Sequence, residues 1–283
     1  MKLRIGASSR FHTVYAGGEY TPREMVEHFH RVGFEGIDFD LETVPAMGED
    51  WRRILGEAAE LAAKYDIQMD YGHLPFHKIR GADGRPSAEL FSRNMMLAIE
   101  AAGYAGIKNA VIHPIDARDG EDGLERNIEY LTPFAEQAQK HGVRLTIENM
   151  RSPREAEGVH RYGSTADEII AIADYFGAGN CWDFGHANTS GLVQSEEIAK
   201  LGSRLTVLHV NDNHAAQDLH LLPYFGTIDW PDAMRGLSLA GFCGVFNYEC
   251  RMVRLPDDRA ARDGVAAYAI AIGRYLTGLI EGA

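Results

Sequence analysis

Histidine, aspartate and glutamate residues recur along this chain at the downstream ends of short apolar runs. The clearest cases follow four successive runs and are Glu148, Asp183, His209 and Glu249. Imidazole and carboxylate groups are the ligands that hard and borderline divalent metal ions prefer. The pattern therefore predicts a metal-dependent active site.

These four residues, called the quartet below, contain three carboxylates. Three carboxylates on one small site repel one another unless a cation lies between them. The oxygen-rich set suits one divalent ion, Mn²⁺, Mg²⁺ or Zn²⁺. Such an ion can bind adjacent carbonyl and hydroxyl oxygens of a sugar and stabilise an enediolate. We then expect Glu148 and Glu249 to act as an acid/base pair on opposite sides of the reacting carbon.

The elements that must carry these residues alternate between strand-like and helix-like segments, which favours parallel βα units. Eight strands are predicted, at residues 3–7, 36–41, 67–71, 110–113, 143–147, 180–183, 205–210 and 244–248. Eight parallel strands close a (β/α)8 TIM barrel, which brings all carboxyl ends to one face. We predict an α/β protein with a single TIM barrel over residues 1–283 and the active site at that face.

Helix starts are readable between the strands. Thr21 and Thr165 each precede a glutamate by three residues, as in a capping box. Pro22 suits the first position of the helix that follows Thr21, and Gly177 suits the end of the helix that follows Thr165. Further helices are expected near residues 51–65, 88–102, 124–141, 195–201, 231–240 and 264–280.

Composition narrows the class of protein. The chain has 283 residues, 45% of them hydrophobic, and no linker-like stretch divides it, so one domain is expected. No apolar span is long enough to cross a bilayer. The first residues are strand-like, so no signal peptide is expected. Three cysteines without CxxC spacing suit a reducing cytoplasm. A net charge of −13 disfavours nucleic acid, and no glycine-rich nucleotide motif follows a strand. The oligomeric state, a homo-oligomer included, stays open.

The order of motifs resembles the xylose isomerase-like TIM-barrel superfamily of sugar (phosphate) isomerases and epimerases, which also includes endonuclease IV. The resemblance covers nearly the whole chain, and its most specific parts are residues 181–186, 209–212, 218–220 and 225–230. It implies that the quartet holds the shared metal, that Glu148 and Glu249 are the acid/base pair of epimerase members, and that His186 binds substrate.

A second pattern resembles the endonuclease IV-like members, which hold further metals with histidines and an aspartate. The resemblance implies that the corresponding residues of this chain are His73, His113, His186, Asp218 and His220. The alternative is that these five side chains bind substrate around one metal. We favour the one-metal interpretation, because the motifs do not fix the number of ions. A multinuclear zinc site stays open.

Weaker expectations concern the rim of the site. Arg151, Arg254 and Lys78 follow strand ends and could bind a phosphate or carboxylate. Asn211 and Trp182 are further substrate-binding candidates, although Trp182 is equally suited to the barrel core. The remaining loop histidines, expected to be solvated, are His12, His77, His160 and His214.

The leading functional hypothesis is a metal-dependent isomerase or epimerase of a small sugar, sugar phosphate or polyol ketone. The alternatives are an endonuclease IV-like zinc phosphodiesterase, a polyol-ketone dehydratase and a non-catalytic sugar-binding protein. The acidity of the chain, the acidic loop at residues 116–122 and the lack of basic, aromatic-interleaved loops count against a DNA substrate.

Overall fold

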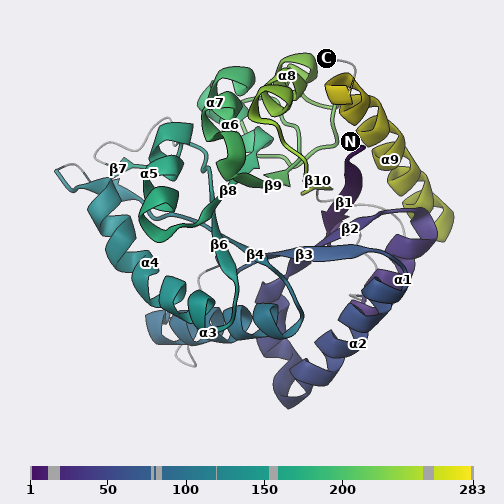
Figure 1. The fold of residues 1–283 in the computed structure, drawn as a ribbon, viewed down its shortest axis with the longest axis horizontal. Coiled ribbons are helices and arrows are strands. Elements are labelled where there is room, and N and C mark those ends of the chain that lie inside the picture. Colours follow the sequence, from purple (N-terminus) through teal and green to yellow (C-terminus); the bar gives the residue numbers. More distant parts are fainter. Residues whose placement is uncertain are drawn as a thin grey trace.

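Eight short apolar segments pair as parallel strands around a central axis in the computed structural model, which describes residues 2–11, 20–77, 80, 85–118, 120–152, 159–250 and 258–281. The helices form a ring outside them (Figure 1). The strands are β1 (Arg4–Ser8), β2 (Gly36–Asp40), β3 (Gln68–His73), β4 (Asn109–Ile112), β6 (Arg144–Glu148), β8 (Gly179–Asp183), β9 (Leu205–His209) and β10 (Val245–Tyr248).

The sheet runs in the order β10-β1-β2-β3-β4-β6-β8-β9, so each strand lies beside its neighbour in sequence. The ring closes where the amide of Val210 donates to the carbonyl of Asn247 (2.8 Å) and the amide of Glu249 donates to the carbonyl of Val210 (3.1 Å). The predicted (β/α)8 barrel is confirmed, and every predicted strand agrees with the observed bounds to within two residues.

The two capping boxes are confirmed. Thr21 caps α1 (Pro22–Val32) and Thr165 caps α5 (Ala166–Phe176), and Gly33 and Gly177 end these helices in the left-handed conformation. The other helical segments are η1 (Leu41–Asp50), α2 (Trp51–Lys64), α3 (Ala88–Tyr104), α4 (Gly123–Lys140), α6 (Phe184–Ser190), α7 (Gln194–Leu201), η2 (Gly202–Arg204), α8 (Trp230–Ala240) and α9 (Arg259–Glu281).

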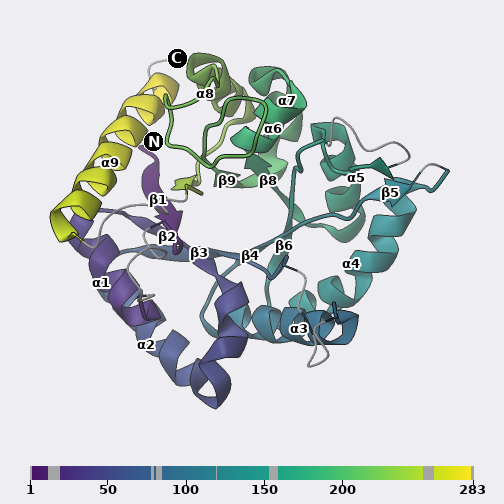
Figure 2. The same ribbon diagram turned by 180° about the vertical axis from the view of Figure 1, so that it is seen from behind.

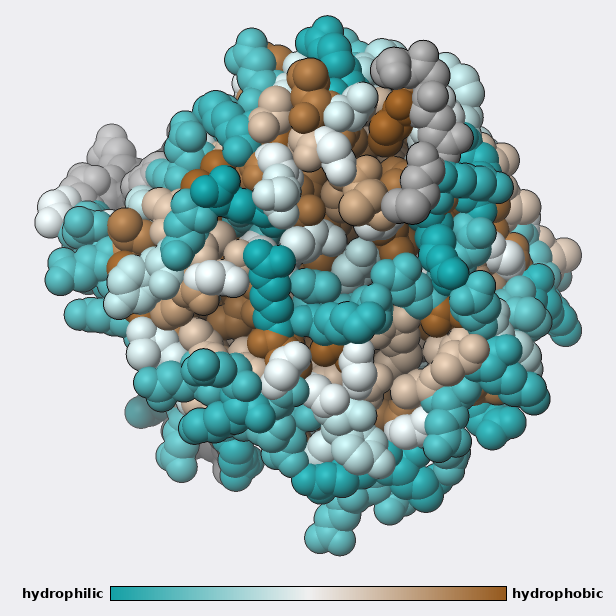
Figure 3. Space-filling model, in the orientation of Figure 1, coloured by the Kyte–Doolittle hydropathy of each residue, from teal (hydrophilic) through white to brown (hydrophobic). Residues whose placement is uncertain are grey.

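Apolar side chains fill two layers. A small cluster inside the ring consists of Tyr71, Val111, Cys181, Val207 and Val245. The larger cluster lies between strands and helices, and in the view of Figure 3 hydrophilic residues cover most of the periphery, with hydrophobic residues in smaller areas between them. Within the described ranges, no helix is both long and apolar enough to cross a membrane.

Two features beside the site were not predicted. Helix α6 starts directly after β8, and its segment has no apolar periodicity to reveal it. The strands β5 (Ala117–Arg118) and β7 (Val159–His160) pair antiparallel as a ribbon between the loops that follow β4 and β6. The ribbon lies at the outer edge beside α4 and α5, where Figure 1 labels β7 and Figure 2 labels β5. Strands of two residues are too short to show an alternation of apolar and polar residues in the sequence.

A buried carboxylate organises the long loop between β9 and α8. Asp212 is fully buried, and its two oxygens accept from the backbone amides of residues 213 (2.8 Å), 224 (3.0 Å) and 228 (3.2 Å) and from the indole of Trp230 (3.0 Å). Gly226 passes so close that a Cβ there would lie 2.2 Å from Asp212 Oδ1. This loop carries Asp218 and His220 to the mouth of the barrel.

Replacing Asp212 by Asn should destabilise the protein, because an amide nitrogen would face donors that now have an acceptor. We expect the free energy of unfolding in a denaturant titration to fall by about 2–4 kcal/mol. Asp229→Asn, at the cap of α8 in the same loop, is the control and should cost about 1 kcal/mol or less. Equal losses in the two variants would contradict the organising role of Asp212.

Candidate metal centre

The quartet meets at the carboxyl ends of four strands. Glu148 ends β6, Asp183 ends β8, His209 ends β9, and Glu249 follows β10. One ligand atom from each lies within 4.8 Å of all the others. The first three side chains are almost completely shielded from solvent, whereas that of Glu249 is 14% exposed. The structure thus brings together the four residues predicted from sequence.

His209 approaches both glutamates through one ring nitrogen. Its Nδ1 is 2.9 Å from Glu148 Oε1 and 3.4 Å from Glu249 Oε2. Ligands about 2.0–2.2 Å from one ion lie roughly 3.0–3.5 Å from each other. The donor atoms therefore have the spacing of a coordination sphere, and the residue types fit a divalent ion.

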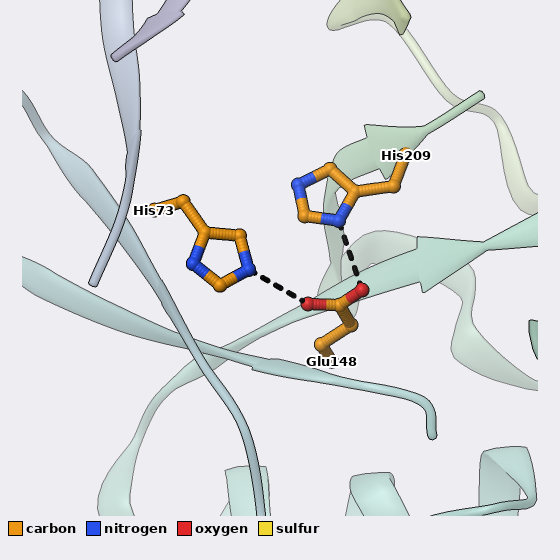
Figure 4. Close-up of side chains that lie close together, drawn as sticks. All are labelled: His73, Glu148 and His209. Atoms are coloured by element: carbon orange, nitrogen blue, oxygen red, sulfur yellow. Dashed lines mark hydrogen bonds and ion pairs between the residues drawn. The ribbon is translucent and has the colours of Figure 1, made fainter. Parts of the chain in front are cut away.

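His73 and His113 approach the second oxygen of Glu148. Glu148 Oε2 lies 3.3 Å from His73 Nε2 and 3.0 Å from His113 Nε2, and the two nitrogens are 3.2 Å apart. Figure 4 shows His73 and His209 directed at different oxygens of this carboxylate. Each oxygen of Glu148 thus faces its own set of imidazoles.

A third group lies on the other side of the mouth. Asp218 Oδ2 is 3.4 Å from His186 Nε2 and 3.3 Å from His220 Nε2. The structure therefore collects all five of the additional residues, His73, His113, His186, Asp218 and His220, around the quartet.

Backbone carbonyls fix the ring orientation of three of these histidines. Nδ1 of His73, His186 and His220 donates to the carbonyls of Leu74 (2.8 Å), Asn149 (2.8 Å) and Glu249 (2.7 Å). Because a carbonyl only accepts, Nδ1 carries the proton, and Nε2 of a neutral ring presents a lone pair to the site. That lone pair faces a carboxylate oxygen, so a cation, either a proton or a metal ion, must lie between them.

The pKa shifts of the buried carboxyl and imidazole groups also indicate that the site needs positive charge. Burial opposes ionisation of Glu148, but His209 and His113 hold the pKa of this carboxyl well below its usual range. Burial also opposes a charge on His186, yet Asp183 and Asp218 raise the pKa of this imidazole to about 10. For Asp183, burial outweighs the attraction of His186 and raises the pKa to about 7. A divalent ion would replace the protons that these histidines otherwise hold.

Sequence reasoning missed Asp38, which lies on β2 and is 1% exposed. Its Oδ2 is 3.1 Å from His209 Nε2 and accepts from the side-chain amide of Asn247 (3.1 Å). His209 therefore donates from Nε2 and presents the lone pair of Nδ1 to Glu148 and Glu249. A carboxylate in this second position orients a metal-binding imidazole. The available signal was the two aspartates, Asp38 and Asp40, that alternate with apolar residues in the buried strand Gly36–Asp40.

The weaker substrate-binding candidates have different positions in the structure. Asn211 is buried and donates to Asp183 Oδ2 (2.7 Å), so it positions a quartet residue. Trp182 is fully buried and donates to Gln194 (2.8 Å) on α7, which places it in the core and not at the substrate cavity. Arg151 lines the cavity above the quartet.

The remaining predicted residues are outside the site or outside the described part of the chain. His77 pairs with Glu42 at 2.6 Å, and His214 is exposed. His12, Lys78, Arg254 and the side chain of His160 lie outside what the structure describes.

Removing the carboxylate behind His209 should loosen its orientation. We expect Asp38→Asn to weaken Mn²⁺ or Zn²⁺ binding about 10–100-fold in a chelator-competition titration. Asp70→Asn is the control, because Asp70 lies at the start of β3, where it pairs with Lys108 (3.0 Å). Unchanged affinity in Asp38→Asn, with the fold intact by circular dichroism, would show that His209 needs no such support.

Comparisons with known proteins agree with this architecture. Among curated proteins, the uncharacterized protein y4fM of Sinorhizobium fredii is 32% identical over 260 residues, covering 82% of each chain. An uncharacterized protein of Methanocaldococcus jannaschii is 26% identical over 203 residues, covering 69% of this chain and 68% of its own.

Among solved structures, a D-tagatose 3-epimerase-like protein matches with a TM-score of 0.74 and 21% identity, covering 99% of both chains. The Escherichia coli 3-keto-D-glucoside 4-epimerase YcjR matches with a TM-score of 0.71 and 15% identity, covering 97% of this chain and 100% of its own. At these identities the structures establish the fold alone. The model of the family described as xylose isomerase-like TIM barrel matches residues 26–270, so the chain belongs to the xylose isomerase-like TIM barrel family.

Proposed function

We propose that this protein is a divalent-metal-dependent epimerase or isomerase of a small sugar or related polyol ketone. The observation that carries the proposal is the convergence of Glu148 and Glu249 on one imidazole nitrogen, 2.9 and 3.4 Å from His209 Nδ1, at the carboxyl end of a TIM barrel. The solved relatives named above, a D-tagatose 3-epimerase-like protein and a keto-glucoside epimerase, support the same class of reaction.

Glu148, Asp183, His209 and Glu249 would hold the ion. A divalent ion there would polarise the substrate carbonyl and stabilise the negative charge of an enediolate. The two glutamates come from separate strands, β6 and the end of β10, and in this proposal they act on opposite faces of the substrate. One carboxylate removes the proton next to the carbonyl, and the other returns a proton to the opposite face. Removal and return on opposite faces invert the configuration of that carbon.

The burial of the quartet supports this chemistry. Glu148 is 1% exposed and held ionised by imidazoles, as a base requires, and a shielded site strengthens the interaction between its charges. Asn211 and Asp38 hold Asp183 and His209 from behind, so neither must be ordered when substrate binds.

Glu148→Gln and Glu249→Gln should each lose proton transfer. We expect solvent-deuterium uptake next to the carbonyl of ketose substrates to fall at least about 100-fold, because an amide cannot take the proton. The readout is NMR of the recovered sugar, and Glu60→Gln on the exposed face of α2 is the matched control. Wild-type exchange in either site variant would remove the two-glutamate mechanism. Exchange accompanied by loss of a hydroxyl group would indicate the dehydratase.

A second candidate, an endonuclease IV-like multinuclear zinc phosphodiesterase, is favoured by one observation. Glu148 presents Oε1 to His209 and Oε2 to His73 and His113, so the two oxygens of this carboxylate could each contribute to holding a divalent ion. Asp218, between His186 and His220, adds ligands for a third ion. The net charge of −13 counts against a DNA substrate.

Metal content separates the two candidates. For the epimerase we expect one divalent ion per chain by mass spectrometry of the metal, in the parent protein and in His113→Ala alike. A multinuclear zinc site would instead hold more than one ion and lose one in His113→Ala, because His113 and His73 both face Glu148 Oε2. One ion in both proteins would contradict a multinuclear site. Cleavage of an abasic-site duplex by the zinc-loaded protein, with no deuterium uptake into ketoses, would replace the epimerase by the phosphodiesterase.

A further inference from the structure

The cavity above the quartet is lined by two chemically different groups of side chains. Its volume is about 830 Å³, at the upper end of typical ligand sites. One group consists of carboxylates and imidazoles, including Glu148, Glu249 and His186, and the other consists of four arginines. These arginines are Arg118, Arg126, Arg151 and Arg161.

The arginines come from the ribbon of β5 and β7 and its surroundings. Arg118 belongs to β5, Arg161 follows β7, Arg126 lies in the first turns of α4, and Arg151 follows β6. The ribbon is formed by the loops after β4 and β6 and is not one of the eight βα units of the barrel. It therefore gives one side of the mouth a basic character, although the surrounding segment at residues 116–122 is acidic in sequence.

Two of the four guanidinium groups serve the structure of the ribbon. Arg161 Nε donates to Asp116 Oδ1 (2.9 Å), and Arg126 donates to the carbonyl of Asp116 (2.8 Å) and to Glu121 (3.1 Å). These contacts join the loop after β4 to the segment after β7. They fix the backbone from which Arg118 projects, and the amide of Arg118 is itself held by Glu121 (2.8 Å).

The other two guanidinium groups form no salt bridge with a described residue and are available to a ligand within the described part of the chain. Arg118 and Arg151 are exposed, line the cavity, and have no acidic partner among the residues that the structure describes. Their attachment points are nevertheless ordered, since the amide of Ser152 donates to Ser190 (2.9 Å) and the amide of Met150 to the carbonyl of Gly163 (2.8 Å). Unpaired arginines on a fixed frame suit a ligand that brings its own negative charge.

We infer that the substrate carries one anionic group, a phosphate or a carboxylate, which Arg118 and Arg151 bind while the hydroxyketone end lies at the quartet. This inference rests on the proposed function. A guanidinium matches either anion through paired hydrogen bonds. The carboxylates of the site repel an anion, so a substrate with one anionic group would bind with that group at the arginines.

The cavity is also lined by apolar side chains, with Phe76, Phe91 and Met150 among them. Such side chains pack against the carbon chain of a sugar and exclude water from it. Two free arginines suffice for a single anionic group, whereas a net charge of −13 repels a long polyanion such as DNA.

The test compares matched substrates with the metal-loaded enzyme. Deuterium exchange is measured for D-fructose, D-fructose 6-phosphate and D-fructuronate, so that the phosphate and carboxylate arms are distinguished. We expect one anionic ketose to have a kcat/KM at least about tenfold above that of the neutral ketose, mainly through KM. Arg118→Gln/Arg151→Gln should reduce this preference on the order of 10–100-fold. The double lysine variant should retain part of it, and Arg93→Gln on the exposed face of α3 should leave it unchanged.

Binding of the same ketoses to Glu249→Gln is also measured by calorimetry. Because this variant is expected to lack proton transfer, the measurement tests substrate binding apart from the proposed reaction. Arginine-dependent binding of an anionic ketose without exchange in the wild type would leave the inference standing and remove the epimerase. Exchange on neutral and anionic ketoses with equal kcat/KM, unaffected by the arginine substitutions, would overturn the inference and leave the epimerase. Tighter, arginine-dependent binding of an abasic oligonucleotide than of any ketose would also overturn it.

Discussion

The site depends on cations that compensate carboxylates gathered where water is excluded. Glu148 is the centre of this arrangement, because imidazoles of His209, His73 and His113 lie 2.9–3.3 Å from its two oxygens. Without positive charge between these atoms, the lone pairs of nitrogen and oxygen would face one another in a medium of low dielectric constant. The need for a cation is therefore a property of the folded chain and not only of its composition.

The barrel meets this demand through its surrounding contacts. Backbone carbonyls direct the Nε2 atoms of His73, His186 and His220 inward, and Asp38 does the equivalent for Nδ1 of His209. Asp183 serves two purposes, since it belongs to the quartet and its Oδ1 also accepts from the amide of His186 at the start of α6 (2.6 Å). The ligands are thus oriented before any substrate arrives, which lowers the cost of ordering them during a reaction.

Family membership and geometry answer different questions. The family establishes a xylose isomerase-like barrel, and this fold supports several chemistries at the same strand ends. The distinction between one ion and several depends on the groups around His113 and Asp218, and the choice of substrate depends on the loops above them. In this chain those loops form the ribbon of β5 and β7, which gives the cavity its arginines. If Arg118 and Arg151 bind the substrate as inferred, specificity comes from the loops after β4 and β6, which the barrel determines least.

The sequence by itself determined the strands, the two capped helices and the convergence of the quartet, because apolar runs and capping patterns are local and parallel strands share one carboxyl edge. It could also identify His73, His113, His186, Asp218 and His220 as candidates. Only the tertiary structure decided which oxygen of Glu148 each imidazole faces, that Asp38 stands behind His209 from 171 residues away, and that Trp182 belongs to the core. It alone brought Arg118 and Arg151 to one cavity wall. These relations depend on strand register, side-chain direction and loop pairing over long separations, which no local pattern encodes.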